Sequence, residues 1–138
     1  MVKRLFWERK MENSFFKSFS DTFYDEKLAS LQTYLQGGKA CILGAMKDGV
    51  LNGFLWGYPM DSLEGQKFHI AYIAVLPEGR GAGVGRELLR AAEEWAEELK
   101  ISKMELIVSE QNRSAVQFYQ GQDYGTHRLI MEKRLDEE

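Results

Sequence analysis

The chain has 138 residues and a mass of 15.9 kDa, the size of one ordinary domain, and its 44% hydrophobic content argues against disorder. A net charge of −3 and a pI of about 5.5 disfavour a nucleic-acid-binding protein, which is usually basic. The one cysteine excludes an internal disulfide, and no metal site is expected. No apolar run reaches the roughly 20 residues of a membrane span, so we expect a cytoplasmic protein without a membrane partner.

The first half of the chain predicts strands around a helical stretch. In residues 12–36, Phe and Leu recur at spacings of three, four and seven, which indicates one or two helices ended by Gly37 and Gly38. The pair Asp48-Gly49 is typical of a tight hairpin. The strands predicted here are residues 2–9, 39–46 and 50–58.

The second half alternates strand and helix within the same single predicted domain, residues 1–138. Residues 68–76 are apolar almost throughout, as in a strand covered on both faces. Residues 88–99 have an apolar stripe at helical spacing, with glutamates on the opposite, solvated side. This order implies a right-handed crossover between parallel strands. The remaining predicted elements are a strand at 104–108, a short helix at 113–119, and a strand or bent pair of strands at 124–135.

A glycine-rich turn, residues 77–86, joins the apolar strand to the long helix. Glycines allow close backbone approach, and a helix N-terminus adds free N–H groups and its positive dipole end. With Arg80 and Arg86, this composition predicts a phosphate or pyrophosphate site. A P-loop is excluded because Gly85 precedes arginine rather than lysine, and a dinucleotide turn from Gly81 would need glycine at Arg86. A connector without a ligand is the alternative.

Two blocks of the sequence resemble the GCN5-related N-acetyltransferases, the GNAT family. Residues 80–85 fit the motif Arg-x-x-Gly-x-Gly, and residues 112–119 fit Asn-x-x-Ala-x-x-Phe-Tyr. The resemblance covers about residues 68–124. It implies a single mixed, mostly antiparallel sheet of six to seven strands with a splayed parallel central pair, flanked by about four helices.

The resemblance also implies the activity. The family moves the acetyl group of acetyl-CoA to a primary amine by direct attack in a ternary complex, so we expect a small-molecule or peptide amine as partner. The pantetheine arm would pair with the apolar strand, and amides of the glycine turn would hold the pyrophosphate. The residues implied for coenzyme binding are Ile73, Ala74, Val75, Arg80, Gly81, Ala82, Gly83, Val84, Gly85, Arg86 and Asn112.

Acetyl transfer to an amine needs an acid for the thiolate and a base for the amine. The resemblance makes Tyr119 the acid, because a phenol suits a thiolate leaving group. His69 is the candidate base, since imidazole exchanges protons near neutral pH. A covalent route through Cys41 is disfavoured because no partner is evident. The alternative bases are Glu64, Asp61, Tyr72 and a chain of water molecules.

The other candidate residues have structural alternatives. Trp56 and Tyr58 share a strand face by alternation and would frame a cationic amine through cation–π contacts, unless they only pack in the core. Asn112 would bind the coenzyme or cap the following helix.

The chain departs from the family after Tyr119. Asp123 and Tyr124 stand where the family has Gly-Phe, and aspartate tolerates the left-handed conformation of such a turn. The end is short, and a homodimer is one arrangement that would complete the substrate end. The alternative functions are a non-catalytic acetyl-CoA-binding or sensing domain and a phosphate-ligand module outside the family.

Overall fold

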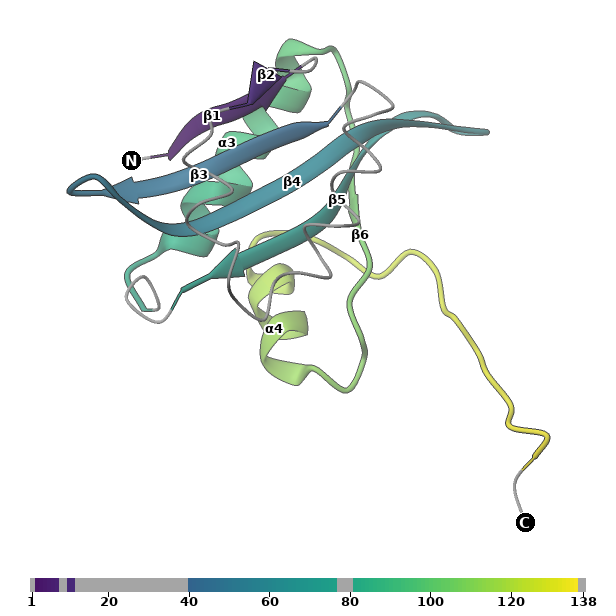
Figure 1. Ribbon diagram of the computed structural model, residues 1–138. Coiled ribbons are helices and arrows are strands. Elements are labelled where there is room, and N and C mark those ends of the chain that lie inside the picture. The colour runs from purple at the N-terminus through teal and green to yellow at the C-terminus, as the bar shows by residue number, and fades with distance from the viewer. Residues whose placement is uncertain (1, 8–9, 12–39, 77–80, 137–138) are drawn as a thin grey trace. The chain divides into compact units, whose positions relative to one another are not determined.

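The computed structural model describes residues 2–7, 10–11, 40–76 and 81–136 (Figure 1). The chain groups into two compact units, residues 1–107 and 108–138. No helix among the described residues is long and apolar enough to cross a membrane.

The first unit contains one six-stranded sheet with the order β2-β1-β3-β4-β5-β6. All neighbouring strands are antiparallel except β5 and β6, which are parallel. The coarse prediction, a mixed α+β fold on a single, mostly antiparallel sheet, is therefore confirmed. The strands are β1 (Val2–Trp7), β2 (Lys10–Met11), β3 (Cys41–Lys47), β4 (Val50–Ser62), β5 (Gly65–Val75) and β6 (Met104–Leu106).

Two hairpins connect β3, β4 and β5. The predicted turn between β3 and β4 is confirmed, because Asp48 and Gly49 have φ angles of 53° and 77°, as a tight primed turn requires. The second hairpin is longer than predicted, and its strands pair up to Ser62 and Gly65. The Ser62 hydroxyl closes that turn by donating to the Gly65 carbonyl at 2.6 Å.

Helix α3 (Val84–Glu98) lies across one face of the sheet (Figure 1). The predicted stripe is confirmed and faces the sheet. The helix ends in a Schellman turn, with Lys100 at a φ of 62° and the Ile101 N–H donating to the Ala96 carbonyl at 2.9 Å. Arg4 of β1 also holds the helix, through an ion pair with Glu98 and a position 4.3 Å from the Trp95 ring centroid. The buried residues of the stripe are Leu88, Leu89, Ala92, Trp95 and Ala96.

The second unit contains α4 (Arg113–Gly121). The residues that begin and end this helix take the roles that the sequence predicts for them. Asn112 caps the start, because its side-chain oxygen accepts from the Ala115 N–H at 3.3 Å. At the other end Asp123 has a φ of 69°, which confirms that aspartate takes the left-handed position. The Tyr124 N–H then donates to the Tyr119 carbonyl at 3.0 Å.

Two predictions about elements need correction. Residues 124–134 form no strand, because a strand needs a neighbour for its backbone groups and the described sheet ends at β6. The parallel pair β5 and β6 is not central, because β6 is an edge strand of the described sheet. Strand β2 was not expected. Two helices are described against about four predicted, and the stretch 12–36 lies outside the described residues.

Candidate functional site

The pairing between the parallel strands β5 and β6 stops before β5 ends. Their register covers only the pairs from Phe68↔Met104 to Ile70↔Leu106. Beyond that point β5 continues to Val75, still paired with β4 on its other side. This is the end of the pair at which a splay is predicted. The β6 side of the end of β5 is left without a strand neighbour among the described residues.

A β-bulge in β5 lies directly after Ile70, where the pairing with β6 ends. Trp56 pairs with Tyr72, but the next residue, Gly57, pairs with Ile70, so Ala71 is the extra residue. Only glycine fits opposite this point: a Cβ on Gly57 would lie 2.5 Å from the His69 carbonyl oxygen. The close approach of Gly57 thus fixes how the chain runs through the bulge.

The glycine turn joins β5 to α3. Gly81 and Gly83 both have a φ of 79°, a region that residues with a side chain rarely adopt. Gly83 is also the N-cap of α3, and within the described part of the turn no side chain caps the first N–H groups. The Arg86 side chain folds back toward this point, with Nη2 3.4 Å from where a Gly83 Cβ would be. Uncapped amides, two left-handed glycines and a guanidinium fit a phosphate group.

The other predicted coenzyme residues of this unit have these positions. Ile73, Ala74 and Val75 pair with Leu55, Phe54 and Gly53 of β4, at the end of β5 that continues beyond its pairing with β6. Ala82 is exposed in the turn, whereas the Val84 side chain is buried against the sheet and leaves only its backbone for a ligand. Arg80 lies outside the described residues.

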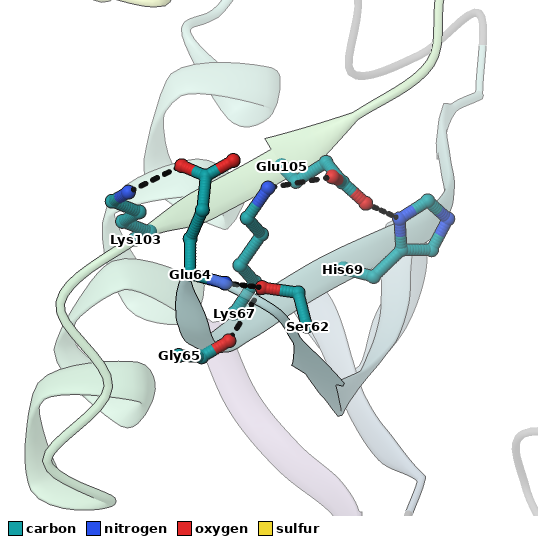
Figure 2. Close-up of polar contacts among 7 residues, drawn as sticks. All are labelled: Ser62, Glu64, Gly65, Lys67, His69, Lys103 and Glu105. Atoms are coloured by element: carbon teal, nitrogen blue, oxygen red, sulfur yellow. Dashed lines mark hydrogen bonds and ion pairs between the residues drawn. The ribbon is translucent and has the colours of Figure 1, made fainter.

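His69 on β5 belongs to a polar cluster with Lys67 and Glu105 (Figure 2). The Glu105 carboxylate lies 2.7 Å from His69 Nδ1 and 3.6 Å from Lys67 Nζ. Desolvation raises the pKa of Glu105, but the hydrogen bond and charge of His69 and the charge of Lys67 outweigh it and leave this pKa below its usual value. The sequence did not indicate this cluster, because only the register of β5 and β6 brings Glu105 to His69 and Lys67.

The alternative base Glu64 lies in the exposed turn between β4 and β5 and pairs with Lys103 at 3.2 Å. Figure 2 shows this pair beside the His69 cluster.

The two predicted acceptor residues lie on the same face of β4, as expected. The ring centroids of Trp56 and Tyr58 are 6.4 Å apart, and the Tyr58 ring lies 5.3 Å from the His69 ring. Trp56 is buried in a core cluster with Phe54, whereas Tyr58 is half-buried. The structure therefore brings Tyr58 and His69 together.

The second unit contains Tyr119 and Asn112. Burial raises the pKa of the Tyr119 phenol, so it keeps its proton at neutral pH. Its ring lies edge-on to Phe118 and Tyr124, with centroids 5.3 and 6.1 Å away. The Asn112 oxygen is used by the helix cap.

Two features bear on other kinds of chemistry. In the described part of the chain, no group of three His, Cys, Asp or Glu side chains is placed to hold a metal ion. Cys41 is fully buried in β3, and this burial raises the pKa of its thiol to about 12, only partly offset by Arg4. Such a thiol is not an activated nucleophile.

Comparison with known proteins decides the family. The model of the acetyltransferase (GNAT) family matches residues 4–124. The chain belongs to this family. The predicted family is thus confirmed, and with it the predicted class of enzyme, an acetyl-CoA-dependent acetyltransferase. No curated protein matches the chain.

Solved GNAT-type structures share the fold over nearly the whole chain. A putative acetyl transferase from Pyrococcus furiosus is 26% identical with a TM-score of 0.76, and 98% of this chain and 99% of that one are covered. The aminoglycoside N-acetyltransferase AAC(6')-Iy, solved with CoA, is 21% identical with a TM-score of 0.75 and coverages of 97% and 98%. The enzyme AAC(6')-IG from Acinetobacter haemolyticus is 18% identical with a TM-score of 0.73, and 99% of each chain is covered.

Proposed function

We propose that this GNAT protein transfers the acetyl group of acetyl-CoA to a primary amine of a small molecule, in a ternary complex without an acetyl-enzyme intermediate. The observation that carries the proposal is the family match over residues 4–124, with the glycine turn at the start of α3 in the place that the motif requires. A buried Cys41 with a raised thiol pKa supports direct attack rather than a covalent cysteine route.

Acetyl-CoA binds along β5 and the start of α3. The pantetheine arm pairs with the backbone of residues 73–75, where β5 continues beyond β6. The pyrophosphate lies on the amides of the described glycine turn, Gly81 to Gly85, with the charge of Arg86 beside it. Asn112 donates its side-chain NH₂ group to the same arm, since its oxygen already caps α4.

The chemistry needs two proton transfers around one attack. The amine nitrogen attacks the thioester carbon, the C–S bond breaks, and an amide and free CoA thiol are formed. His69 accepts the proton that the amine loses. Tyr119, whose phenol is protonated at neutral pH, donates a proton to the departing sulfur.

The acceptor lies against Tyr58, whose half-buried ring contacts His69. An aromatic face attracts a cationic amine, and Trp56 supports that ring from the core. The aminoglycoside acetyltransferases among the fold neighbours put aminoglycosides first in a panel of test amines. Polyamines, amino acids, peptide N-termini and lysine follow.

The test is release of CoA thiol from acetyl-CoA across this panel, with Tyr119→Phe beside the native chain. We expect turnover with at least one amine, and a kcat at least about 10-fold lower in Tyr119→Phe with a similar KM for acetyl-CoA. Tight coenzyme binding without turnover on any amine would instead indicate the alternative, a non-catalytic acetyl-CoA-binding or sensing domain. An unchanged kcat in Tyr119→Phe would remove this residue as the acid.

A further inference from the structure

Glu105 on β6 connects two side chains of β5 (Figure 2). Its Oε2 lies 2.7 Å from His69 Nδ1, and its Oε1 lies 3.6 Å from Lys67 Nζ. The side chain of Lys67 is only 6% exposed, and that of His69 is 14% exposed. A buried ammonium group needs a paired negative charge, so Glu105 both compensates Lys67 and holds His69.

This contact determines which nitrogen of His69 carries the proton. Glu105 is ionised at neutral pH, because its neighbours lower its pKa more than desolvation raises it. An ionised carboxylate only accepts hydrogen bonds, so His69 Nδ1 must donate. The lone pair of the neutral ring is then on Nε2, which points away from Glu105 in Figure 2.

We infer that Glu105 is a positioning residue for His69: one carboxylate oxygen accepts from Nδ1, the other is paired with buried Lys67, and Nε2 is left as the proton acceptor. This inference rests on the proposed acetyl transfer. In that reaction the amine N–H bond breaks, the proton goes to Nε2, and the nitrogen lone pair forms the bond to the acetyl carbon.

Lys67 is needed because a lone carboxylate beside an imidazole favours the charged ring. A protonated ring has no lone pair for the amine proton. The ammonium group of Lys67 on the other oxygen reduces the net charge that His69 meets. Titratable groups contact His69 from two neighbouring strands, Glu105 from β6 and Tyr58 from β4, and Lys67 acts through Glu105.

The inference predicts opposite effects of two nearly isosteric substitutions. Glu105→Gln removes the negative charge and leaves Lys67, so His69 should titrate about one pH unit lower. Lys67→Met removes the positive charge and leaves Glu105, so His69 should titrate about one pH unit higher. The measurement is NMR of the imidazole ring signals against pH. The chain has two histidines, and a His127→Gln background leaves His69 as the only source of these signals.

The tautomer supplies a second NMR readout. Ring ¹⁵N shifts should show the proton on Nδ1 in the native chain. In Glu105→Gln the amide oxygen should turn to the Lys67 ammonium and the NH₂ group to His69 Nδ1, which moves the ring proton to Nε2. In Glu105→Leu the preference for Nδ1 should be lost. The neighbouring exposed pair provides matched controls: Lys103→Met and Glu64→Gln break the 3.2 Å contact and should leave the titration of His69 in place.

Kinetics then connects the cluster to acetyl transfer. The low-pH limb of kcat/KM for the amine should move down in Glu105→Gln and up in Lys67→Met. Above that limb, Glu105→Leu and Glu105→Gln should both have a kcat about 10-fold lower with an unchanged KM for acetyl-CoA, because neither side chain holds the ring proton on Nδ1.

The outcomes separate this inference from the proposed function. The inference is overturned if the His69 titration moves equally or not at all in folded Glu105→Gln and Lys67→Met. It is also overturned if the titration moves by NMR while the low-pH limb of kcat/KM stays where it is in the native chain. If some amine is acetylated but His69→Gln keeps its kcat, the inference is wrong while the proposed function stands. If no amine is acetylated, the proposed function fails and the catalytic part of the inference fails with it.

Discussion

Gly57→Ala tests whether the close approach of β4 to β5 beside His69 leaves room for a side chain, with the stability of the fold as the readout. The added Cβ would lie 2.5 Å from the His69 carbonyl oxygen and 2.7 Å from Cε1 of Phe68. Ordinary contacts need about 3.5 Å, so the strands must separate by roughly 1 Å at this point. One neighbour is backbone and the other is a fully buried ring, so neither has room to move.

The expected cost follows from overpacking in cores. Insertion of an extra methyl group into a tightly packed site costs about 1–3 kcal/mol, and a clash with backbone belongs at the upper end. The unfolding entropy of a 138-residue chain is about 0.3 kcal/mol/K, so a loss of about 3 kcal/mol lowers Tm by roughly 10 °C. Gly53→Ala should cost less, since its nearest neighbours would be Val84 Cγ1 at 2.9 Å and the Ala74 oxygen at 3.1 Å.

The assay is thermal and urea unfolding of both variants beside a matched control. Gly121→Ala adds the same methyl group to α4, where a Cβ meets nothing within 4 Å. In a helix this change should be neutral or stabilising by up to about 1 kcal/mol. The predicted order of Tm is therefore Gly121→Ala, then Gly53→Ala, then Gly57→Ala. A Gly57→Ala variant that melts within about 2 °C of the native chain would refute the reasoning.

Three further predictions concern the turn, the buried thiol and acid stability. Gly83→Val should raise the KM for acetyl-CoA about 10-fold or more, because valine is strained at a φ of 79° and displaces the Arg86 guanidinium; an unchanged KM would contradict the turn as pyrophosphate site. Cys41 should react with a disulfide reagent at pH 8 only as fast as the chain opens, because burial raises its thiol pKa to about 12; rapid labelling of the native chain would contradict this. The lowered pKa of Glu105 stabilises the fold above about pH 4.3, and this stabilisation is lost as the pH falls through the lower folded value. Urea titrations should therefore show a steeper acid loss in the native chain than in Glu105→Gln, and parallel losses would count against the contact.

The features that were predicted correctly depend on local signals. The apolar stripe of α3 needs only its own spacing, and Asp48-Gly49 needs only its own backbone preference. The same holds for the Asn112 cap and for the left-handed Asp123, each of which is decided within one turn. The glycine turn was recognisable because its chemistry comes from consecutive residues.

The expected last strand shows why local signals were insufficient elsewhere. Residues 124–135 contain enough apolar side chains to suggest a strand, yet a strand exists only with a partner for its backbone. In the structure Leu129, Ile130 and Met131 are 79%, 77% and 90% exposed, and the backbone around them is irregular. The residues themselves do not specify the pairing that their pattern would need.

The position of His69 depends on a feature that no alternation pattern contains. Paired residues of antiparallel strands lie on the same side of a sheet, and here Trp56 pairs with Tyr72 while Tyr58 pairs with His69. The step from Trp56 to Tyr58 is two residues along β4, whereas the step from Tyr72 to His69 is three residues along β5. The bulge in β5 accounts for the extra residue. A strict period of two would have put His69 on the opposite face from Tyr72. Its contact with Glu105 depends in turn on the register of a strand 36 residues away in sequence. The candidate base was thus visible in the sequence as a residue type, but the bulge and the parallel register that position it were not.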